Sequence, residues 1–281
     1  MKLIVKEKML LLEYLYKYLD MPKKKIKSYL THGLIYVNNT KTTKYDYEVY
    51  EGMTIQIETK KKNSLLFDIL YEDDYIIVVN KPGGLLTIAT QKEKEKTLYH
   101  YVSSYLKEKN KKNKVFIVHR LDRETSGIVL FAKDEKTKNM LQKDWNNLVK
   151  VREYTAIVHG KMKKKQDKLI NKLLETKTNL VYITNKDDGK EAITNYQVVK
   201  ENASYSLLKI NIETGRKNQI RVQLANINNP IVGDHKYGKN DSMKKLYLHA
   251  NKLKVFYPIL KRDMVFKTDI PEDYKRVIWK Y

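Results

Sequence analysis

Cysteine is absent from this chain of 281 residues, and so are several features that mark common classes of protein. Without cysteine there is no disulfide, no thiolate nucleophile and no cysteine-ligated zinc site. No stretch approaches the ~18 consecutive apolar residues of a membrane span. The N-terminal segment lacks signal-peptide character, because charged residues interrupt its apolar positions. We therefore expect a cytoplasmic protein without a membrane partner.

Motifs for nucleotide cofactors and catalytic metals are also missing. The sequence contains no Gly-rich phosphate loop, no dinucleotide fingerprint, no His-Glu-x-x-His and no serine nucleophile elbow. Its six histidines occur singly, and single histidines are more often structural groups than metal ligands. The sequence therefore predicts neither a cofactor nor a metal site.

Arginine is scarce, although the chain is strongly basic. Lysine and arginine together number 56 against 33 acidic residues, a formal charge of +23, which indicates a polyanionic partner such as nucleic acid. An anionic membrane surface is the alternative. Only seven of the basic residues are arginines, and we expect them where a planar, bidentate donor is needed. They are Arg120, Arg123, Arg152, Arg216, Arg221, Arg262 and Arg276.

The first 60 residues have the pattern of a small separate domain. Apolar residues at three- and four-residue spacing predict one helix over 10–19, and Pro22 opens a second that ends at Gly33. Short strands around a turn at Asn38 and Asn39 follow. The charged segment 59–64 is the predicted linker, which divides the chain into domains 1–60 and 61–281.

Short apolar strands and two helical stretches alternate in the second domain. Runs such as YIIVVN, GIVLFAK and YSLLKINIE predict buried strands, and TLYHYVSSYLKE predicts a helix. We expect an α+β fold with a large mixed, mainly antiparallel sheet flanked by helices. The lysine-rich tracts 107–114 and 161–168 are predicted to be exposed loops.

A charged segment, HRLDRETSG at 119–127, separates two apolar runs. A carboxylate that stays ionised in a water-poor pocket needs a positive partner, and Arg221 is the predicted partner of Asp122. Lys217 and Arg221, four residues apart, would share one face of a helix. The alternative for this segment is a polar surface turn that ends at Gly127.

Several motifs together resemble a known enzyme family. VHRLDRETSGIVLFAK resembles the signature of RluA-type pseudouridine synthases, and further family motifs occur in the family's order over residues 71–257. They are IIVVNKPGGLLT, REYTAIVHG, ETGRKNQIRVQLA, NPIVGDHKYG and LYLHANKLKV. The N-terminal domain looks like the S4-type RNA-binding domain that many members carry.

The resemblance implies roles for individual residues. Asp122 would be the catalytic carboxylate, Tyr154 would stack on the uracil, and Arg221 would form a salt bridge with Asp122. Arg120 would fill the space left by the nucleotide that turns out of the RNA helix. The other expected RNA contacts are Arg216, Lys23, Lys24 and Lys27.

The chain departs from the family pattern at three positions near the site. Lys217 and Asn218 stand where the family usually has threonine and histidine, and Gln223 replaces a common histidine. These differences bear on RNA target preference rather than on the reaction.

We therefore expect a monomeric RNA pseudouridine synthase with a pseudouridine synthase fold, which modifies large-subunit ribosomal RNA or transfer RNA. Asp122 would either attack C1′ or remove the 2′ proton, and Tyr154 or a water would take the C5 proton. The alternatives are a non-catalytic RNA-binding protein of ribosome assembly and a base-excising glycosylase. The glycosylase is disfavoured because no second acid is apparent to activate water.

Overall fold

The chain forms two compact units in a computed structural model that describes residues 2–57, 65–238 and 242–279. One unit comprises Met1–Leu65 and the other Leu66–Tyr281. The predicted linker, residues 59–64, lies outside the described residues. Because each unit has a buried apolar core of its own, each is described by itself.

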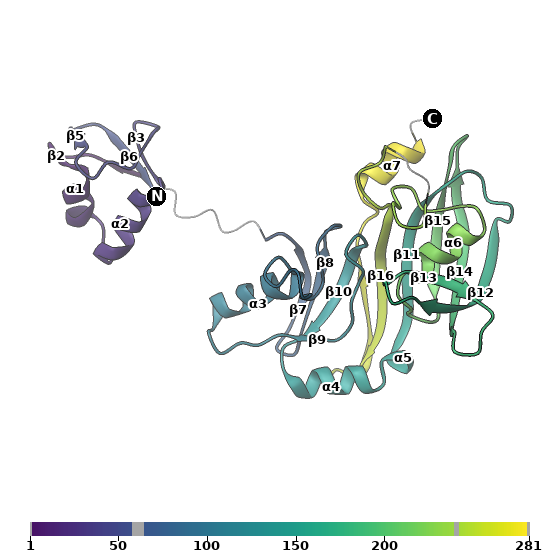
Figure 1. The fold of residues 1–281 in the computed structure, drawn as a ribbon. Coiled ribbons are helices and arrows are strands. Elements are labelled where there is room, and N and C mark those ends of the chain that lie inside the picture. The colour runs from purple at the N-terminus through teal and green to yellow at the C-terminus, as the bar shows by residue number, and fades with distance from the viewer. Residues whose placement is uncertain (1, 58–64, 239–241, 280–281) are drawn as a thin grey trace. The chain divides into compact units, whose positions relative to one another are not determined.

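The N-terminal unit packs two helices against short antiparallel strands (Figure 1). Its elements are β1 (Lys2–Ile4), β2 (Met9–Leu10), α1 (Leu11–Tyr18), α2 (Lys23–Thr31), β3 (Ile35–Val37), β4 (Thr40–Thr42), β5 (Glu48–Val49) and β6 (Thr54–Ile57). Leu11 and Leu15 of α1 share a core with Ile26 and Leu30 of α2, at the spacing expected of two amphipathic helices. Pro22 directly precedes α2, where its missing N–H breaks no helical hydrogen bond.

The hairpin between β3 and β4 turns at the two residues predicted for it. Asn38 and Asn39 have φ values of 47° and 66°, the left-handed region that asparagine tolerates better than most residues. The resulting sheet has the strand order β1-β6-β3-β4, and β2 pairs separately with β5. The helix–helix–hairpin pattern predicted for this part of the chain is therefore present.

The second unit is built on one sheet of eleven strands, in the order β13-β12-β14-β15-β11-β16-β10-β8-β7, with β17 beside β16 and β9 beside β10. Only β10 and β16 run parallel among the described strand pairs, so the α+β, mainly antiparallel fold is confirmed. Its strands are β7 (Asp68–Glu72), β8 (Ile76–Lys81), β9 (Phe116–Ile117), β10 (Ser126–Ala132), β11 (Val149–His159), β12 (Gln166–Glu175), β13 (Val181–Thr184), β14 (Lys190–Glu201), β15 (Tyr205–Ile212), β16 (Leu248–Tyr257) and β17 (Arg262–Lys267). Its helices are α3 (Leu98–Lys109), α4 (Glu135–Lys143), α5 (Trp145–Leu148), α6 (Gln219–Asn226) and α7 (Glu272–Trp279).

The first four residues of strand β8 are apolar because both faces of the strand are covered there. Ile77 and Val79 lie in the cluster that contains the buried side of α3, whereas Ile76 and Val78 lie in the cluster that contains Leu141 of α4. Since side chains alternate between the two faces of a strand, continuous apolar character indicates burial on both. The run IIVV therefore marks a strand between two layers of helices (Figure 1).

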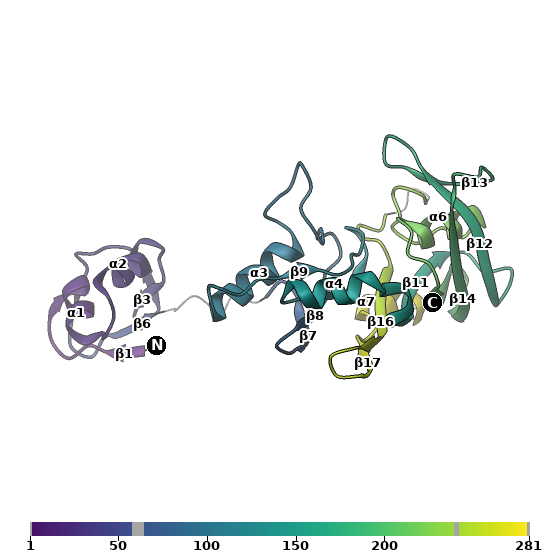
Figure 2. The same cartoon turned by 90° about the horizontal axis from the view of Figure 1, so that it is seen from below.

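The outer strands β12–β14 carry α6 against one face (Figure 2).

The prediction that the two lysine-rich tracts are loops is wrong in part. Residues 107–109 finish α3, because the buried face of that helix extends to Leu106. Residues 166–168 begin β12, which pairs with β14 from Gln166 onward. No helix in the described ranges has the length and apolar character required to cross a membrane.

Candidate active site

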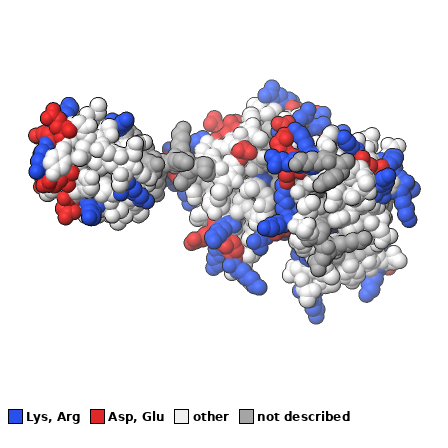
Figure 3. Space-filling view, turned by 90° about the horizontal axis from the view of Figure 1, so that it is seen from above, with Lys and Arg blue, Asp and Glu red and all other residues white. Residues whose placement is uncertain are grey.

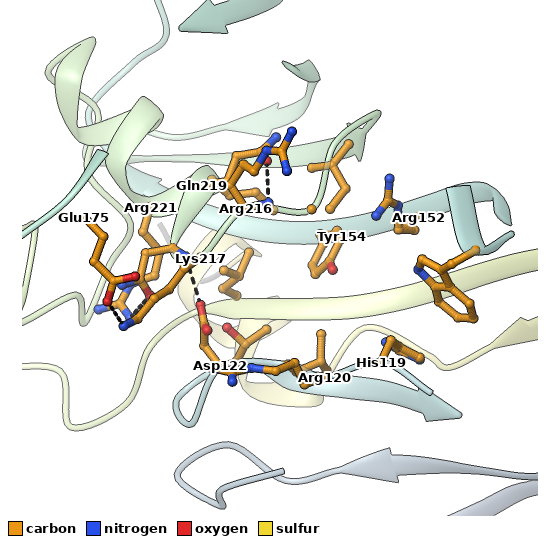
Figure 4. Close-up of a pocket in the computed structure, with 18 of the residues that line it drawn as sticks. His119, Arg120, Asp122, Arg152, Tyr154, Glu175, Arg216, Lys217, Gln219 and Arg221 are labelled. Carbon is orange, nitrogen blue, oxygen red and sulfur yellow. Dashed lines mark hydrogen bonds and ion pairs between the residues drawn. The ribbon is translucent and has the colours of Figure 1, made fainter. Parts of the chain in front are cut away.

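The segment 119–125 connects β9 to β10 and lines an open pocket of about 640 Å³. The opposite wall comes from the loop before α6 and from the β12–β13 hairpin, and Tyr154 of β11 lies between (Figure 4). A volume of this size suits a ligand of nucleotide dimensions. The strands fix the two loops relative to each other because both loops leave the same sheet.

Asp122 is half-buried and faces the loop before α6. Its Oδ2 accepts a hydrogen bond of 3.3 Å from the main-chain N–H of Asn218. Asn218 has φ 54°, a left-handed conformation, at the point where the loop enters α6. One carboxylate is thus held at a defined position in the pocket.

The expected ion pair between Asp122 and Arg221 is not formed, and this prediction is corrected. Arg221 is buried in α6, and its Nε and Nη2 donate to the two oxygens of Asp234 at 2.8 and 2.6 Å. Burial alone would lower the pKa of the guanidinium, but hydrogen bonding to Asp234 raises it above its ordinary value, with the charge of Asp122 as a further cause. Asp234 lies closer because its loop packs directly on α6.

Arg221 is connected to Asp122 indirectly, through hydrogen bonds to the side chain and from the main chain of Asn218. Its Nη1 donates to Oδ1 of Asn218 at 3.3 Å, while the Nδ2 of Asn218 donates to the hydroxyl of Tyr237 at 3.0 Å. The side chain of Asn218 is therefore held from two sides while its main chain contacts Asp122. Arg221 is a long-range positive charge for Asp122 rather than its direct partner.

Tyr154 forms the wall between Asp122 and Arg152 (Figure 4). Burial raises the pKa of the Tyr154 hydroxyl to about 12, although the positive charge of Arg152 opposes the shift. The phenol is therefore protonated near neutral pH, which argues against Tyr154 as the acceptor of the C5 proton and favours the water that was the other expectation. Its ring remains available as an apolar surface.

His119 is a structural residue at the beginning of the segment. Burial lowers its pKa to about 3, with the charge of Arg152 as a second cause, so the ring is neutral. Its Nε2 accepts a hydrogen bond of 3.0 Å from the main-chain N–H of Leu130. The ring also stacks on Trp145, with 4.8 Å between centroids. His119 thereby fixes the loop to β10 and α5.

The loop before α6 is held by Gln219. The Oε1 of Gln219 accepts from the Thr214 hydroxyl at 2.8 Å and from the Arg216 main-chain N–H at 3.0 Å. Its Nε2 donates to Ile193 O and Thr194 Oγ1.

The prediction that Lys217 and Arg221 share a helix face is wrong, because α6 begins only at Gln219. Lys217 instead contacts Glu175 and Asn179 across the pocket.

The remaining predicted RNA contacts are exposed. Arg120 lines the pocket, and no ion pair of its side chain occurs within the described ranges. Arg216 lines it too, with Nε donating to Glu191 O at 2.9 Å. The N-terminal lysines lie exposed at the start and middle of α2, in the other unit, and are Lys23, Lys24 and Lys27.

Sequence reasoning missed Lys81, which ends β8 and is fully buried. Its ammonium donates three hydrogen bonds, to the main-chain oxygens of Pro82, Leu85 and Arg123, at 3.0, 2.7 and 3.0 Å. Burial lowers the pKa of Lys81 to about 7, and the charges of Glu124 and Asp122 oppose the shift. A lysine at the end of an apolar strand, just before Pro-Gly-Gly, was the available signal.

The pocket offers one free carboxylate and an excess of positive charge. Glu175 is the other acid in its lining, and Lys217 occupies it. Across the described part of the chain no cluster of His, Asp and Glu has the arrangement of a metal site. A single carboxylate beside an aromatic ring can attack or deprotonate a sugar carbon, but it lacks the second acid that hydrolysis of a glycosidic bond generally uses.

Comparisons with known proteins identify the family. The family model of RNA pseudouridylate synthases matches residues 75–226. An uncharacterised RNA pseudouridine synthase of Bacillus subtilis, YhcT, is 32% identical over 76% of this chain and 72% of its own length. The ribosomal large subunit pseudouridine synthase D of Buchnera aphidicola is 31% identical over 91% of this chain and 88% of its own.

A solved structure agrees at the level of the fold. Human RNA pseudouridylate synthase domain containing 4 superposes with a TM-score of 0.62 at 23% identity, covering 74% of this chain and 90% of the human chain. The residues that line the pocket around Asp122 lie within the matched sequence, apart from Leu248 of β16. The chain therefore belongs to the RNA pseudouridylate synthase family.

Proposed function

We propose that this chain isomerises specific uridines of large-subunit ribosomal RNA to pseudouridine, with Asp122 as the catalytic carboxylate. The observation that carries the proposal is the carboxylate of Asp122, held by the Asn218 N–H in a pocket lined by Tyr154 and arginines. The ribosomal target rests on relatives named ribosomal large subunit pseudouridine synthase D, which match 91% and 92% of this chain. Transfer RNA is the alternative target.

The reaction breaks the N1–C1′ bond, turns the uracil and joins its C5 to C1′. Asp122 attacks C1′ or removes the 2′ proton, and Tyr154 stacks on the base so that it stays in the pocket. With the phenol protonated, a water near Asp122 is the better acceptor for the C5 proton. Arg221 holds the side chain of Asn218, whose main-chain N–H contacts Asp122.

The uridine must first leave the RNA stack, which costs a few kcal/mol that contacts to the backbone offset. Arg120 at the pocket rim occupies the vacated space. Basic side chains spread over the face of the larger unit shown in Figure 3 supply salt-sensitive phosphate contacts. The N-terminal unit acts as an S4-like RNA-binding domain, with the exposed lysines of α2 on the RNA.

The reaction is tested with total RNA from a strain that lacks the protein. After incubation, carbodiimide-dependent stops of reverse transcription map each pseudouridine. We expect new stops in large-subunit ribosomal RNA with the wild type and none with Asp122→Asn, which should bind RNA normally. Equal stops with both proteins would refute the role of Asp122, and stops confined to transfer RNA would refute the ribosomal target.

The role of the N-terminal unit is tested by deletion of residues 1–60. Its loss should weaken RNA binding and reduce the dependence of affinity on salt, since fewer counterions are released. Tryptophan fluorescence verifies that the larger unit is folded, because both tryptophans of the chain, Trp145 and Trp279, lie in it. Unchanged affinity and salt dependence would contradict an RNA-binding role.

A further inference from the structure

Two arginines, Arg152 and Arg216, line the same pocket, and the guanidinium of Arg152 lies against Gly215, the residue before Arg216. Arg152 lies on β11 and Arg216 in the loop before α6. Burial lowers the pKa of the Arg152 guanidinium, Tyr154 opposes this, and the positive charge of Arg216 lowers the pKa further. This direction agrees with two like charges that line the same pocket.

Neighbouring backbone holds both groups in place. Arg152 Nη2 donates to the main-chain oxygen of Glu213 at 2.5 Å, and Arg216 Nε donates to that of Glu191 at 2.9 Å. A Cβ atom on Gly215 would stand only 2.8 Å from Arg152 Nη1, so the guanidinium lies directly against the glycine. Each guanidinium has five N–H donors, and these carbonyls do not use all of them.

The carboxylates next to this pair have other partners. Glu213 accepts from Asn195 at 2.9 Å and pairs with Lys168 at 2.9 Å. Glu153 accepts from Asn251 at 2.8 Å and pairs with Lys209 at 3.2 Å. Among the described residues, arginine ion pairs are formed by Arg123 with Glu124 and by Arg221 with Asp234, so neither Arg152 nor Arg216 has a carboxylate partner of its own.

We propose that Arg152 and Arg216 together bind one phosphodiester group of the RNA, next to the uridine that enters the pocket. This inference rests on the proposed function. Guanidinium groups match phosphate oxygens in a bidentate geometry, and a single anion between two of them removes their mutual repulsion. The site lies across Tyr154 from Asp122, so it positions the nucleotide without touching the reacting atoms (Figure 4).

A double-mutant cycle distinguishes a shared phosphate from two separate contacts. Affinity for an unmodified large-subunit ribosomal RNA transcript is measured for the full-length wild type, Arg152→Met, Arg216→Met and the double variant. Each single change should weaken binding about tenfold, the scale of one charge-assisted contact. The fold-loss of affinity in the double variant should be much smaller than the product of the two single losses, because both changes remove contact with the same phosphate.

Two further variants make the test specific. Gly215→Ala displaces the Arg152 guanidinium without removing charge, and should weaken binding by less than Arg152→Met does. Arg262→Met removes an exposed guanidinium outside the pocket and should change affinity less than about twofold. The shared site would be overturned if Arg152→Met and Arg216→Met both bound RNA with wild-type affinity. It would also be overturned if the loss of affinity in the double variant equalled the product of the two single losses.

Product formation separates this inference from the proposed reaction. Arg152→Met should form pseudouridine slowly at low RNA concentration and at the wild-type rate when RNA is saturating. A reduced rate at saturation would overturn the assignment as a binding site. Absence of pseudouridine with the wild type would refute the proposed function, while the binding cycle would still decide whether the two arginines share a phosphate.

Discussion

The main-chain N–H of Asn218 lies 3.3 Å from Oδ2 of Asp122 and connects two loops that are 96 residues apart in the chain. Asn218 makes this contact in a left-handed conformation, with φ 54°. The conformation of one main-chain unit, rather than a side-chain ion pair, therefore holds the carboxylate in the pocket.

This contact can be tested with two variants that differ only in backbone preference. Asn218→Gly and Asn218→Ala both lose the side-chain bonds to Arg221 and Tyr237. Glycine adopts φ 54° freely, whereas alanine pays about 1–2 kcal/mol of steric strain there. The alanine variant should therefore be several-fold slower than the glycine variant in single-turnover modification at saturating RNA. Equal rates would show that the backbone position is unimportant.

Removing one partner of the buried pair of Arg221 and Asp234 should destabilise the fold. Asp234→Leu leaves the guanidinium buried without a counterion, which costs about 3–5 kcal/mol in the free energy of unfolding. The double variant Arg221→Met/Asp234→Leu should recover most of this loss, because apolar side chains then fill the space. Urea unfolding followed by tryptophan fluorescence measures both; a double variant no more stable than Asp234→Leu would contradict the prediction.

Lys81 predicts a pH dependence of stability with a defined sign. Its pKa is about 7 in the folded chain and 10.5 ordinarily, so between these values the unfolded chain binds a proton that the folded chain lacks. The free energy of unfolding therefore rises with pH in this window, by up to about 1.4 kcal/mol per pH unit. Below about pH 7 the contribution is flat.

The comparison protein for this prediction is Lys81→Met, which cannot titrate at this position. The difference in unfolding free energy between wild type and variant should be constant at acid pH and should grow in favour of the wild type above about pH 7. Urea unfolding at several pH values measures it. A difference that stays constant from pH 6 to 9 would exclude a titrating Lys81.

Gly127 should tolerate no side chain, because β10 and β16 meet there. A Cβ atom at Gly127 would lie 2.2 Å from the main-chain oxygen of Ala250, and its φ is 116°. Gly127→Ala should therefore destabilise by more than ~2 kcal/mol, since two main chains must separate. Gly84→Ala is the control, with φ 81° and no atom within 4 Å of the added Cβ, and should cost only about 1–2 kcal/mol of strain. Similar losses in both variants would contradict the close approach.

Local patterns in the sequence predicted the elements well. The spacing of Leu11, Leu15, Ile26 and Leu30 predicted two helices, and the apolar run of β8 predicted a buried strand. Such patterns show which face of an element is buried, and the spacing of residues within that element is enough to reveal it. The ends of elements were less predictable, because the pairing of β12 with a distant strand decides where it begins.

The partner of Arg221 shows where sequence reasoning stopped. Asp122 and Asp234 both follow apolar segments, and nothing local distinguishes them as partners of a guanidinium. The packing of the Asp234 loop on α6 decided the choice, and Arg221 donates two hydrogen bonds there. Lys217 was misplaced for a related reason, since the left-handed Asn218 delays the beginning of α6.

The sequence by itself determined the family, the α+β class and the positions of Asp122 and Tyr154. Family motifs and burial patterns consist of residues that are close together in the chain. Only the tertiary structure decided how charge is arranged around them. It paired Arg221 with Asp234, buried Lys81 under the segment 119–125, and left Arg152 and Arg216 together without a counterion. Those relationships join residues far apart in the chain, and only the folded sheet brings them within hydrogen-bonding or Coulomb distance.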